Sequence, residues 1–222
     1  MTDLHTHILP GMDDGAPDVT TSLAMLHAQH RQGVDTVVLT PHFYRMDESV
    51  GRFLSRRQAS FDALQKSLPE NAPRLILGAE VAWYRAILEE PRIPELCIGD
   101  SKCLLLELPL QPWSDTLLEQ IYQLAGVMGV TPILAHVERY LHLQKRGQIE
   151  RLQEMGIPMQ LSANVFEKRL FRGKWLRLLS RGTWFLGSDC HDTDTRPPNL
   201  SVAAPYIEKR LPNAEEILSW HP

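Results

Sequence analysis

Asp3-Leu4-His5-Thr6-His7 opens the chain, and the interpretation of the whole sequence starts from this stretch. Residues i and i+2 of a β-strand point to the same face, so His5 and His7 can direct two imidazoles toward one point. That arrangement suits a metal ion, although a lone His-x-His is more often just two polar residues near a terminus. The weight of the motif therefore depends on how the other apolar segments end.

Apolar segments alternate with amphipathic ones along the chain, which is typical of an α/β fold. Short and nearly continuous apolar runs fit parallel strands covered on both faces. They predict strands at Met1–Thr6, Asp35–Thr40, Arg74–Ala79, Lys102–Glu107, Thr131–Ala135, Pro158–Ser162 and Thr183–Gly187. Helices are expected at about residues 18–33, 50–68, 114–129, 143–156, 165–181 and 203–211, with Asp18 and Ser114 as N-caps and Gly33 and Gly156 as stops. Seven such units favour a (β/α) barrel over an open doubly wound sheet, in a single domain of residues 1–222.

The ends of the predicted strands carry the functional signal, because (β/α) barrels present their catalytic residues at the C-terminal ends of the strands. Six of the seven strands are followed by imidazoles or carboxylates, and the loop after the first strand adds one more. Unpaired buried carboxylates are costly, and cations remove that cost. Nine ligands without a thiolate suit two or three ions of Mn, Fe or Zn. The candidates are His5, His7, Asp14, His42, Glu80, Glu107, His136, Asp189 and His191.

Composition excludes several other classes of protein. A net charge of −4 argues against a nucleic-acid partner. The sequence has no run of about 18 apolar residues, so membrane insertion is not expected. The histidine motif begins too early to leave room for a signal peptide, and the three cysteines fit a reducing cytoplasm. The basic and aromatic stretch Lys168–Arg177 is interpreted as a solvated helix face, with a docking surface for an acidic or phosphorylated partner as the alternative.

An ordered set of short motifs resembles the PHP (polymerase and histidinol phosphatase) superfamily, and closely the CpsB/YwqE-type bacterial protein-tyrosine phosphatases. The resemblance runs from Met1 to about Pro198, and its most specific part is residues 3–16. The set continues with Thr40-Pro41-His42, Gly78-Ala79-Glu80, Leu106–Pro109, His136–Tyr140 and Gly187–His191. One departure is Phe43, which follows His42 where relatives commonly have a second histidine. None of the departures removes a predicted ligand.

The resemblance implies a distorted seven-stranded, TIM-like barrel that holds three ions, often manganese, at the C-terminal ends of its strands. By resemblance, the first ion takes His5, His7, Glu80 and Asp189. Glu80 bridges to a second ion completed by Glu107 and His136, and the third ion takes Asp14, His42 and His191. Arg139 and Arg196 correspond to the family's phosphate-binding catalytic arginines, and a guanidinium fork suits phosphate geometry.

The implied activity is hydrolysis of protein phosphotyrosine by a hydroxide that bridges two metal ions. The implied substrate is the phosphorylated tail of a bacterial tyrosine kinase that controls capsule or exopolysaccharide synthesis. A different PHP activity, such as histidinol-phosphate hydrolysis, is the main alternative, but such relatives typically place a histidine where this chain has Asp14. A metal-stabilised binding domain without catalysis is another alternative.

A thiolate mechanism is the remaining alternative, because Cys190 and Arg196 have the Cys-x5-Arg spacing of thiol-based tyrosine phosphatases. That loop normally needs glycines so that its amides can wrap a phosphate, and this one has none. It also carries Asp192 and Asp194, which repel phosphate and disfavour a thiolate. We therefore expect Cys190 to be a packing residue.

Overall fold

The computed structural model describes residues 1–145 and 147–220, so His221 and position 146 of the predicted helix 143–156 lie outside the described part. The strands are β1 Thr2–Thr6, β2 Thr36–Leu39, β3 His42–Phe43, β4 Arg74–Leu77, β5 Glu80–Ala82, β6 Cys103–Glu107, β7 Thr131–Leu134, β8 Met159–Ser162 and β9 Trp184–Gly187. The α-helices are α1 Val19–Arg31, α2 Val50–Gln65, α3 Asp115–Met128, α4 Gln148–Glu154, α5 Arg172–Leu179, α6 Ala204–Arg210 and α7 Ala214–Leu218. Short 3₁₀ turns are η1 Ile87–Glu89, η2 Ile93–Leu96, η3 Val137–Arg139, η4 Ala163–Phe166, η5 Arg169–Phe171 and η6 Leu200–Val202.

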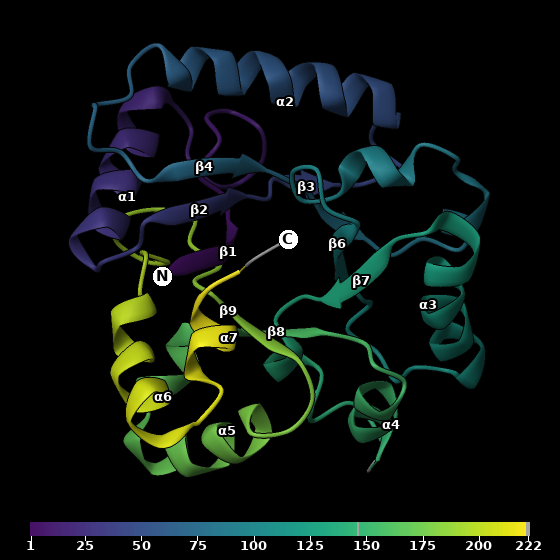
Figure 1. Ribbon diagram of the computed structural model, residues 1–222. Helices are drawn as coiled ribbons and strands as arrows, with labels where there is room; N and C mark the ends of the chain where they lie inside the picture. Colours follow the sequence, from purple (N-terminus) through teal and green to yellow (C-terminus); the bar gives the residue numbers. More distant parts are fainter. Residues whose placement is uncertain (146, 221–222) are drawn as a thin grey trace.

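The described strands form two parallel sheets, ordered β1-β2-β4 and β3-β5-β6-β7-β8-β9. Helices lie around the outside of both sheets (Figure 1). The chain passes from the first sheet to the second at two places, from β2 to β3 and from β4 to β5, and each connection is only a few residues long. On the other side, Thr6 of β1 forms a parallel bridge with Cys190, just after β9.

The sequence predicts one continuous strand where the structure has β2 and β3, and another where it has β4 and β5. Pro41 lacks an amide hydrogen and cannot donate to a neighbouring strand, so the ladder is interrupted there. After the interruption, His42 and Glu80 face each other in register as the first residues of β3 and β5. The structure therefore confirms an α/β fold with parallel sheets, whereas one closed barrel sheet is not seen among the described strands.

Apolar side chains are buried on both faces of the sheets, which explains the continuous apolar runs in the sequence. The smaller buried cluster takes one side chain from each of five strands: Leu4, Val38, Ile76, Leu105 and Ile133. The larger cluster packs the helices against the outer faces. The strands are thus fixed from both sides, and their C-terminal ends present polar side chains at one edge.

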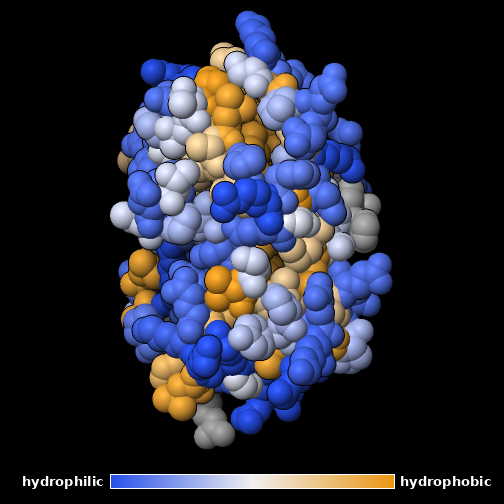
Figure 2. Space-filling view, turned by 90° about the vertical axis from the view of Figure 1, so that its left-hand side faces the viewer, coloured by the Kyte–Doolittle hydropathy of each residue, from blue (hydrophilic) through white to orange (hydrophobic). Residues whose placement is uncertain are grey.

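The helix ends follow the predicted capping. Asp18 and Ser114 accept hydrogen bonds from Thr21 N and Leu117 N, and so cap α1 and α3. Gly33 and Gly156 follow α1 and α4 with positive φ, as their role as stops requires. In residues 1–145 and 147–220, no helix combines the length and apolar character that a membrane crossing needs. The side that carries α1 and α6 is mainly hydrophilic, with hydrophobic side chains in separate patches (Figure 2).

The predicted helix 165–181 is wrong in its first half. Lys168 has an extended backbone with ψ 95°, so this stretch divides into η4, η5 and the shorter α5. The Arg172 side chain donates from Nε to the Phe166 carbonyl at 2.6 Å and folds α5 back onto η4. This contact, between residues six apart, outweighs the helical pattern of the local sequence.

Candidate metal centre

Four side chains from three parts of the chain converge at the edge of the sheets. His5 Nε2 lies 3.0 Å from His7 Nε2 and 3.1 Å from Glu80 Oε2. Asp189 Oδ1 lies 3.5 Å from His5 Nε2 and 3.4 Å from His7 Nε2. Metal–ligand bonds of about 2.1 Å in a tetrahedral site separate the ligand atoms by about 3.4 Å. The four atoms are therefore spaced as ligands around one ion.

The three histidines nearest this point each use Nδ1 for a contact that faces away from it. His5 Nδ1 donates to Gln160 Oε1 at 3.2 Å, and His7 Nδ1 donates to Asp13 Oδ2 at 2.8 Å. His191 Nδ1 donates to the Asp189 carbonyl at 3.0 Å. A proton on Nδ1 leaves the Nε2 lone pair free to bind a metal, and outer partners of this kind are typical of ligating histidines.

Glu80 lies between two groups of side chains and faces each with one oxygen. Its Oε2 faces His5 and His7, and its Oε1 lies 2.8 Å from His136 Nε2. Glu107 Oε1 lies 3.4 Å from the same histidine nitrogen. A carboxylate with two such neighbourhoods can bridge two ions.

The remaining candidates meet on the outer side of His7. Asp14 Oδ1 lies 3.6 Å from His42 Nε2 and 3.4 Å from His191 Nε2. His42 has a second contact, from Nδ1 to Glu80 Oε2 at 3.0 Å. It thus belongs geometrically both to the group with Asp14 and to a group with Glu80 and Glu107, whereas the resemblance assigns it to the third ion alone.

Buried polar atoms without hydrogen-bond partners point to missing cations. They include Glu80 Oε2, His42 Nδ1, His136 Nδ1 and His191 Nε2. Leaving such atoms unpaired costs about 1–3 kcal/mol each, so the described donor set fits bound metal ions better than an empty cluster. The donor set has imidazoles and carboxylates but no thiolate, which suits a catalytic divalent ion.

The charge states favour metal binding. Burial would raise the pKa of Glu80, but the charge of His5 and the neighbouring His136 and His42 hold it well below its usual range. Burial would lower the pKa of His136, but Glu107 and Glu80 raise it to about 9. Burial, with the charges of His7 and Arg196, lowers the pKa of His191 to about 4. Glu80 is thus ionised, and a bound cation would take the place of the proton on His136.

Backbone strain marks two of the candidate ligands. His136 and Asp189 have φ of 32° and 55°, and they are the non-glycine residues with positive φ among residues 1–145 and 147–220. Such conformations cost about 1–3 kcal/mol each and persist where the surroundings impose them. Both lie two residues after the end of a strand, where the strain turns the side chain into the site.

Gly15 lies against the backbone of His7, and we expect Gly15→Ala to weaken metal binding. An added Cβ would stand 2.1 Å from the His7 carbonyl oxygen, so the loop that carries Asp13 and Asp14 must move. Disturbing such supporting contacts typically lowers metal affinity about 10- to 100-fold. Titration with manganese measures this loss. Gly126→Ala is the matched control, since nothing lies within 4 Å of its added Cβ, and an equal loss in both variants would contradict the expectation.

Three supporting residues surround the ligands. Asp13 contacts His7 and accepts from the His42 amide at 2.8 Å, as expected for a neighbour of ligands. Gln160 Oε1 also accepts from the His136 amide at 2.6 Å, and Asp3 accepts from the amides of Ser188 and His5. The sequence analysis missed Gln160 and Asp3. Their signal was a polar side chain inside an otherwise apolar buried strand.

Arg139 and Arg196 meet at one oxygen of Asp189. Both donate from Nη2 to Asp189 Oδ2, Arg196 at 2.9 Å, while Asp189 Oδ1 faces the histidines. Their side chains remain 37% and 39% exposed, so the other N–H groups of each fork are open to a ligand. The two predicted phosphate-binding arginines therefore contact the carboxylate of Asp189, which is itself a candidate metal ligand.

Tyr44, Tyr140 and Glu138 lie near the candidate ligands but differ in exposure and in the groups they contact. Tyr44 is 41% exposed and stacks on His42 with ring centroids 5.1 Å apart, at the edge of a hollow of about 320 Å³ that Asp14 also lines. Tyr140 is fully buried and its hydroxyl accepts from the Leu108 amide, so it is a core residue. Glu138 accepts from the Ser162 amide and does not support a ligand directly.

Cys190 is fully buried, and we expect Cys190→Ala to keep kcat within about twofold, with a loss of stability of about 1 kcal/mol. Burial and the charges of Asp3 and Asp189 raise the pKa of the thiol well above its usual value. Such a thiol is inert as a nucleophile. Steady-state kinetics and thermal unfolding measure both effects. An inactive variant that still binds its metals would support the thiolate mechanism instead.

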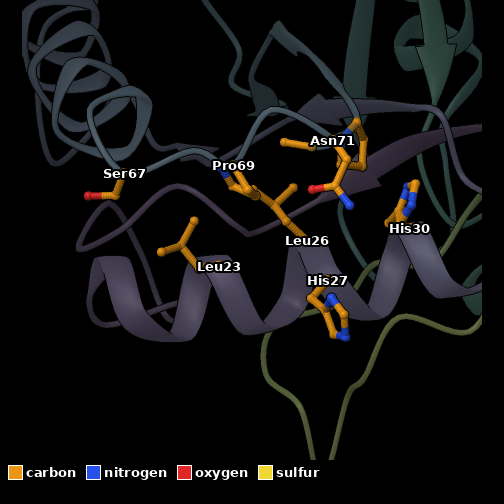
Figure 3. A pocket seen from close by; sticks show the side chains of 9 residues that line it. Leu23, Leu26, His27, His30, Ser67, Pro69 and Asn71 are labelled. Atoms are coloured by element: carbon orange, nitrogen blue, oxygen red, sulfur yellow. The ribbon is translucent and has the colours of Figure 1, made fainter.

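His27 and His30 lie in a separate pocket of about 250 Å³ between α1 and the loop after α2. Figure 3 shows Leu26 and His30 directed toward the loop with Pro69 and Asn71, whereas His27 points away from it. None of the nine candidate ligands lines this pocket. Neither histidine therefore lies with the candidate metal ligands.

Comparisons with known proteins identify relatives of this chain. The family described as "Capsular polysaccharide synthesis, CpsB/CapC" matches residues 1–219. The chain belongs to the CpsB/CapC family. Tyrosine-protein phosphatase CpsB of Streptococcus agalactiae (strain NEM316) is 28% identical over 254 residues, covering 100% of this chain and 99% of the relative. Tyrosine-protein phosphatase YwqE of Bacillus subtilis (strain 168) is 30% identical over 223 residues, covering 95% of this chain and 85% of the relative.

A solved structure of the same family superposes over most of the chain. It comes from the work on YwqE from Bacillus subtilis and CpsB from Streptococcus pneumoniae, described as unique metal-dependent tyrosine phosphatases. The TM-score is 0.75 at 27% identity, covering 94% of this chain and 87% of that one. The α/β fold described above is therefore the fold of these CpsB/CapC relatives.

Proposed function

We propose that this CpsB/CapC protein is a metal-dependent protein-tyrosine phosphatase. The convergence of His5, His7, Glu80 and Asp189 on one point, with two arginines on the far oxygen of Asp189, carries the proposal. The relatives named as tyrosine phosphatases support it. Histidinol phosphate, the alternative substrate, is not favoured by these relatives.

Metal ions would be held in three places by the nine candidate ligands. Bound divalent ions supply an activated water and neutralise charge on the phosphoryl oxygens. We propose manganese, with iron or zinc as alternatives that the same donor set accepts. The two faces of Glu80 support a shared ligand between the first two places, and the contacts of Asp14 with His42 and His191 support the third.

The protein's own part begins with Arg139 and Arg196, which bind the phosphate. Asp189 orients both guanidinium groups by accepting from each, and it leaves their other N–H groups for phosphoryl oxygens. These donors stabilise the charge that develops on the oxygens during in-line displacement. Tyr44, stacked on His42 at the edge of the hollow, is placed to contact the substrate's aromatic ring.

The leaving group explains why no strong general acid is needed. A tyrosine phenol has a pKa near 10, about six units below that of water, so the phenolate leaves with little help. A serine or histidinol alkoxide is a far poorer leaving group. The site therefore favours aryl phosphates on chemical grounds.

The proposal extends to the physiological substrate, the closure of the fold and the cellular location. The physiological substrate is the phosphorylated tail of a bacterial tyrosine kinase, supported by the family's place in capsular polysaccharide synthesis. The seven predicted strands close into a distorted barrel, which forms a single domain. The Thr6–Cys190 bridge and the smaller buried cluster, with side chains from five strands, support this arrangement. The protein works in the cytoplasm, supported by the three free cysteines.

Comparison of three substrates tests the proposed function. We expect the manganese-loaded protein to hydrolyse a phosphotyrosyl peptide with kcat/KM at least about 100-fold above that for the matched phosphoseryl peptide, given the leaving groups. Histidinol phosphate should be turned over as poorly as phosphoserine. Faster turnover of histidinol phosphate would show that the chain is a different phosphatase.

A further inference from the structure

A group of basic and aromatic side chains lies outside the metal centre, on the chain that follows β8. We define the basic–aromatic surface as Lys168, Arg169, Phe171, Lys174 and Trp175. Five cationic side chains and one carboxylate fall between residues 167 and 177, in a chain whose net charge is −4. Among residues 1–145 and 147–220, no ion pair neutralises the three cations of this surface.

The surface is concave and partly apolar. A hollow of about 420 Å³ is lined by Lys168, Phe171, Lys174 and Trp175, together with Asn164, Val165 and one carboxylate, Glu167. Phe171 is 48% exposed and Leu170 beside it is 87% exposed. Lys174 Nζ lies 4.4 Å from the Trp175 ring centroid, so its charge remains at the hollow. Side chains of this kind bind a chain that carries both acidic and apolar groups.

The surface begins at the catalytic edge of the sheet. Asn164 and Val165 belong to η4, which directly follows β8. η4 packs against η6, at the end of the loop that leaves the metal ligands Asp189 and His191. α5 lies beside α6 on the outside of the sheet (Figure 1). A protein segment that leaves the metal centre over the β8 and β9 side therefore extends toward this surface.

Charge divides the catalytic edge into two sides. Asp14, Asp47 and Glu48 line the hollow on the β3 side, together with one cation, Arg56, which pairs with Glu48. Arg139, Arg196 and the basic–aromatic surface lie on the β8 and β9 side. An acidic segment is repelled from the first side and attracted to the second.

We propose that the basic–aromatic surface docks acidic residues that flank the phosphotyrosine of the protein substrate. The inference rests on the proposed function, since it requires a protein substrate at the metal centre. Lys168, Arg169 and Lys174 attract the acidic side chains, and Phe171 and Trp175 cover their apolar neighbours. Small phosphate esters reach the metal centre without using this surface.

Kinetics with two peptides test the proposal. The peptides share one phosphotyrosine and differ only in flanking Glu or Gln residues. The double variant Lys168→Glu/Lys174→Glu should raise KM for the Glu peptide about tenfold, as expected for two reversed exposed charges, with kcat unchanged. Free phosphotyrosine should be hydrolysed as by the unmodified protein. The control Lys66→Glu/Lys102→Glu reverses two exposed lysines at the end of α2 and before β6, and should keep the Glu preference.

Binding separates this proposal from the proposed function. Fluorescence anisotropy of an unphosphorylated Glu peptide on the manganese-loaded protein reports docking without turnover, while hydrolysis of free phosphotyrosine reports the function alone. We expect binding that weakens in high salt and is lost in Lys168→Glu/Lys174→Glu. Equal use of both peptides, or a Glu preference that survives the double variant, would overturn the docking proposal. Co-sedimentation with phosphatidylglycerol vesicles that depends on these lysines, without a peptide preference, would overturn it in favour of a lipid surface.

Discussion

Glu80→Gln should lower kcat at least about 10³-fold, since loss of a charged bridging ligand removes several kcal/mol of metal-derived stabilisation. Glu80 is fully buried, and its two oxygens face His5 and His42 on one side and His136 on the other. The amide keeps the size of the side chain but supplies no charge and places an N–H₂ group against one of these neighbours. Metal binding at the two proposed sites that share Glu80 is therefore weakened at the same time.

Manganese content after dialysis, measured beside kcat, separates loss of metal from loss of fold. Circular dichroism should show the α/β fold retained, because the apolar clusters on both faces of the sheets are unchanged. Glu89→Gln is the matched control, an exposed carboxylate outside the site, and it should leave kcat unchanged. An active Glu80→Gln protein with its full metal content would contradict the bridging role.

Removing an arginine should have the second largest effect. Arg139→Ala or Arg196→Ala should each lower kcat/KM about 10²- to 10³-fold, the usual cost of losing a donor to developing oxyanions. The metal content should stay nearly constant, because the arginines contact Asp189 through Oδ2 and leave Oδ1 to the histidines. This combination differs from that of Glu80→Gln, in which activity and metal are lost together.

Kinetics and manganese content of the same preparations measure this difference. Arg196→Lys should recover only part of the loss, since an ammonium cannot form the two-pronged contact with both Asp189 and phosphate. Arg31→Ala, an exposed arginine at the end of α1, serves as the control. Full activity in both alanine variants would show that phosphate is bound elsewhere.

The candidate ligands could be proposed from the sequence because they follow a simple rule, and their role as ligands stays a prediction. His5, Glu107, His136 and Asp189 lie within two residues of the ends of apolar strands, and parallel strands bring these ends to one edge. Backbone pairing then places side chains distant in sequence side by side, as with His42 and Glu80. Local pattern and long-range packing agree at these positions.

Other features depend on side-chain contacts that the hydrophobic pattern does not reveal. The division of residues 165–181 follows from the contact of Arg172 with the Phe166 carbonyl, between elements that the helical pattern would join. Gln160 is a polar residue inside an apolar strand, and the sequence alone does not explain it. Its side chain has a role only once the fold brings His5 and His136 into contact with it. The second contact of His42, with Glu80, arises only once β3 and β5 pair.

The dependence of phosphotyrosyl-peptide turnover on metal tests the central claim most directly. The purified protein is assayed as isolated, after complete chelation, and after manganese is added back. The account predicts loss of activity on chelation and recovery with manganese, with the same response in Cys190→Ala. Turnover that survives complete chelation would contradict it, and would transfer the chemistry to Cys190 and Arg196.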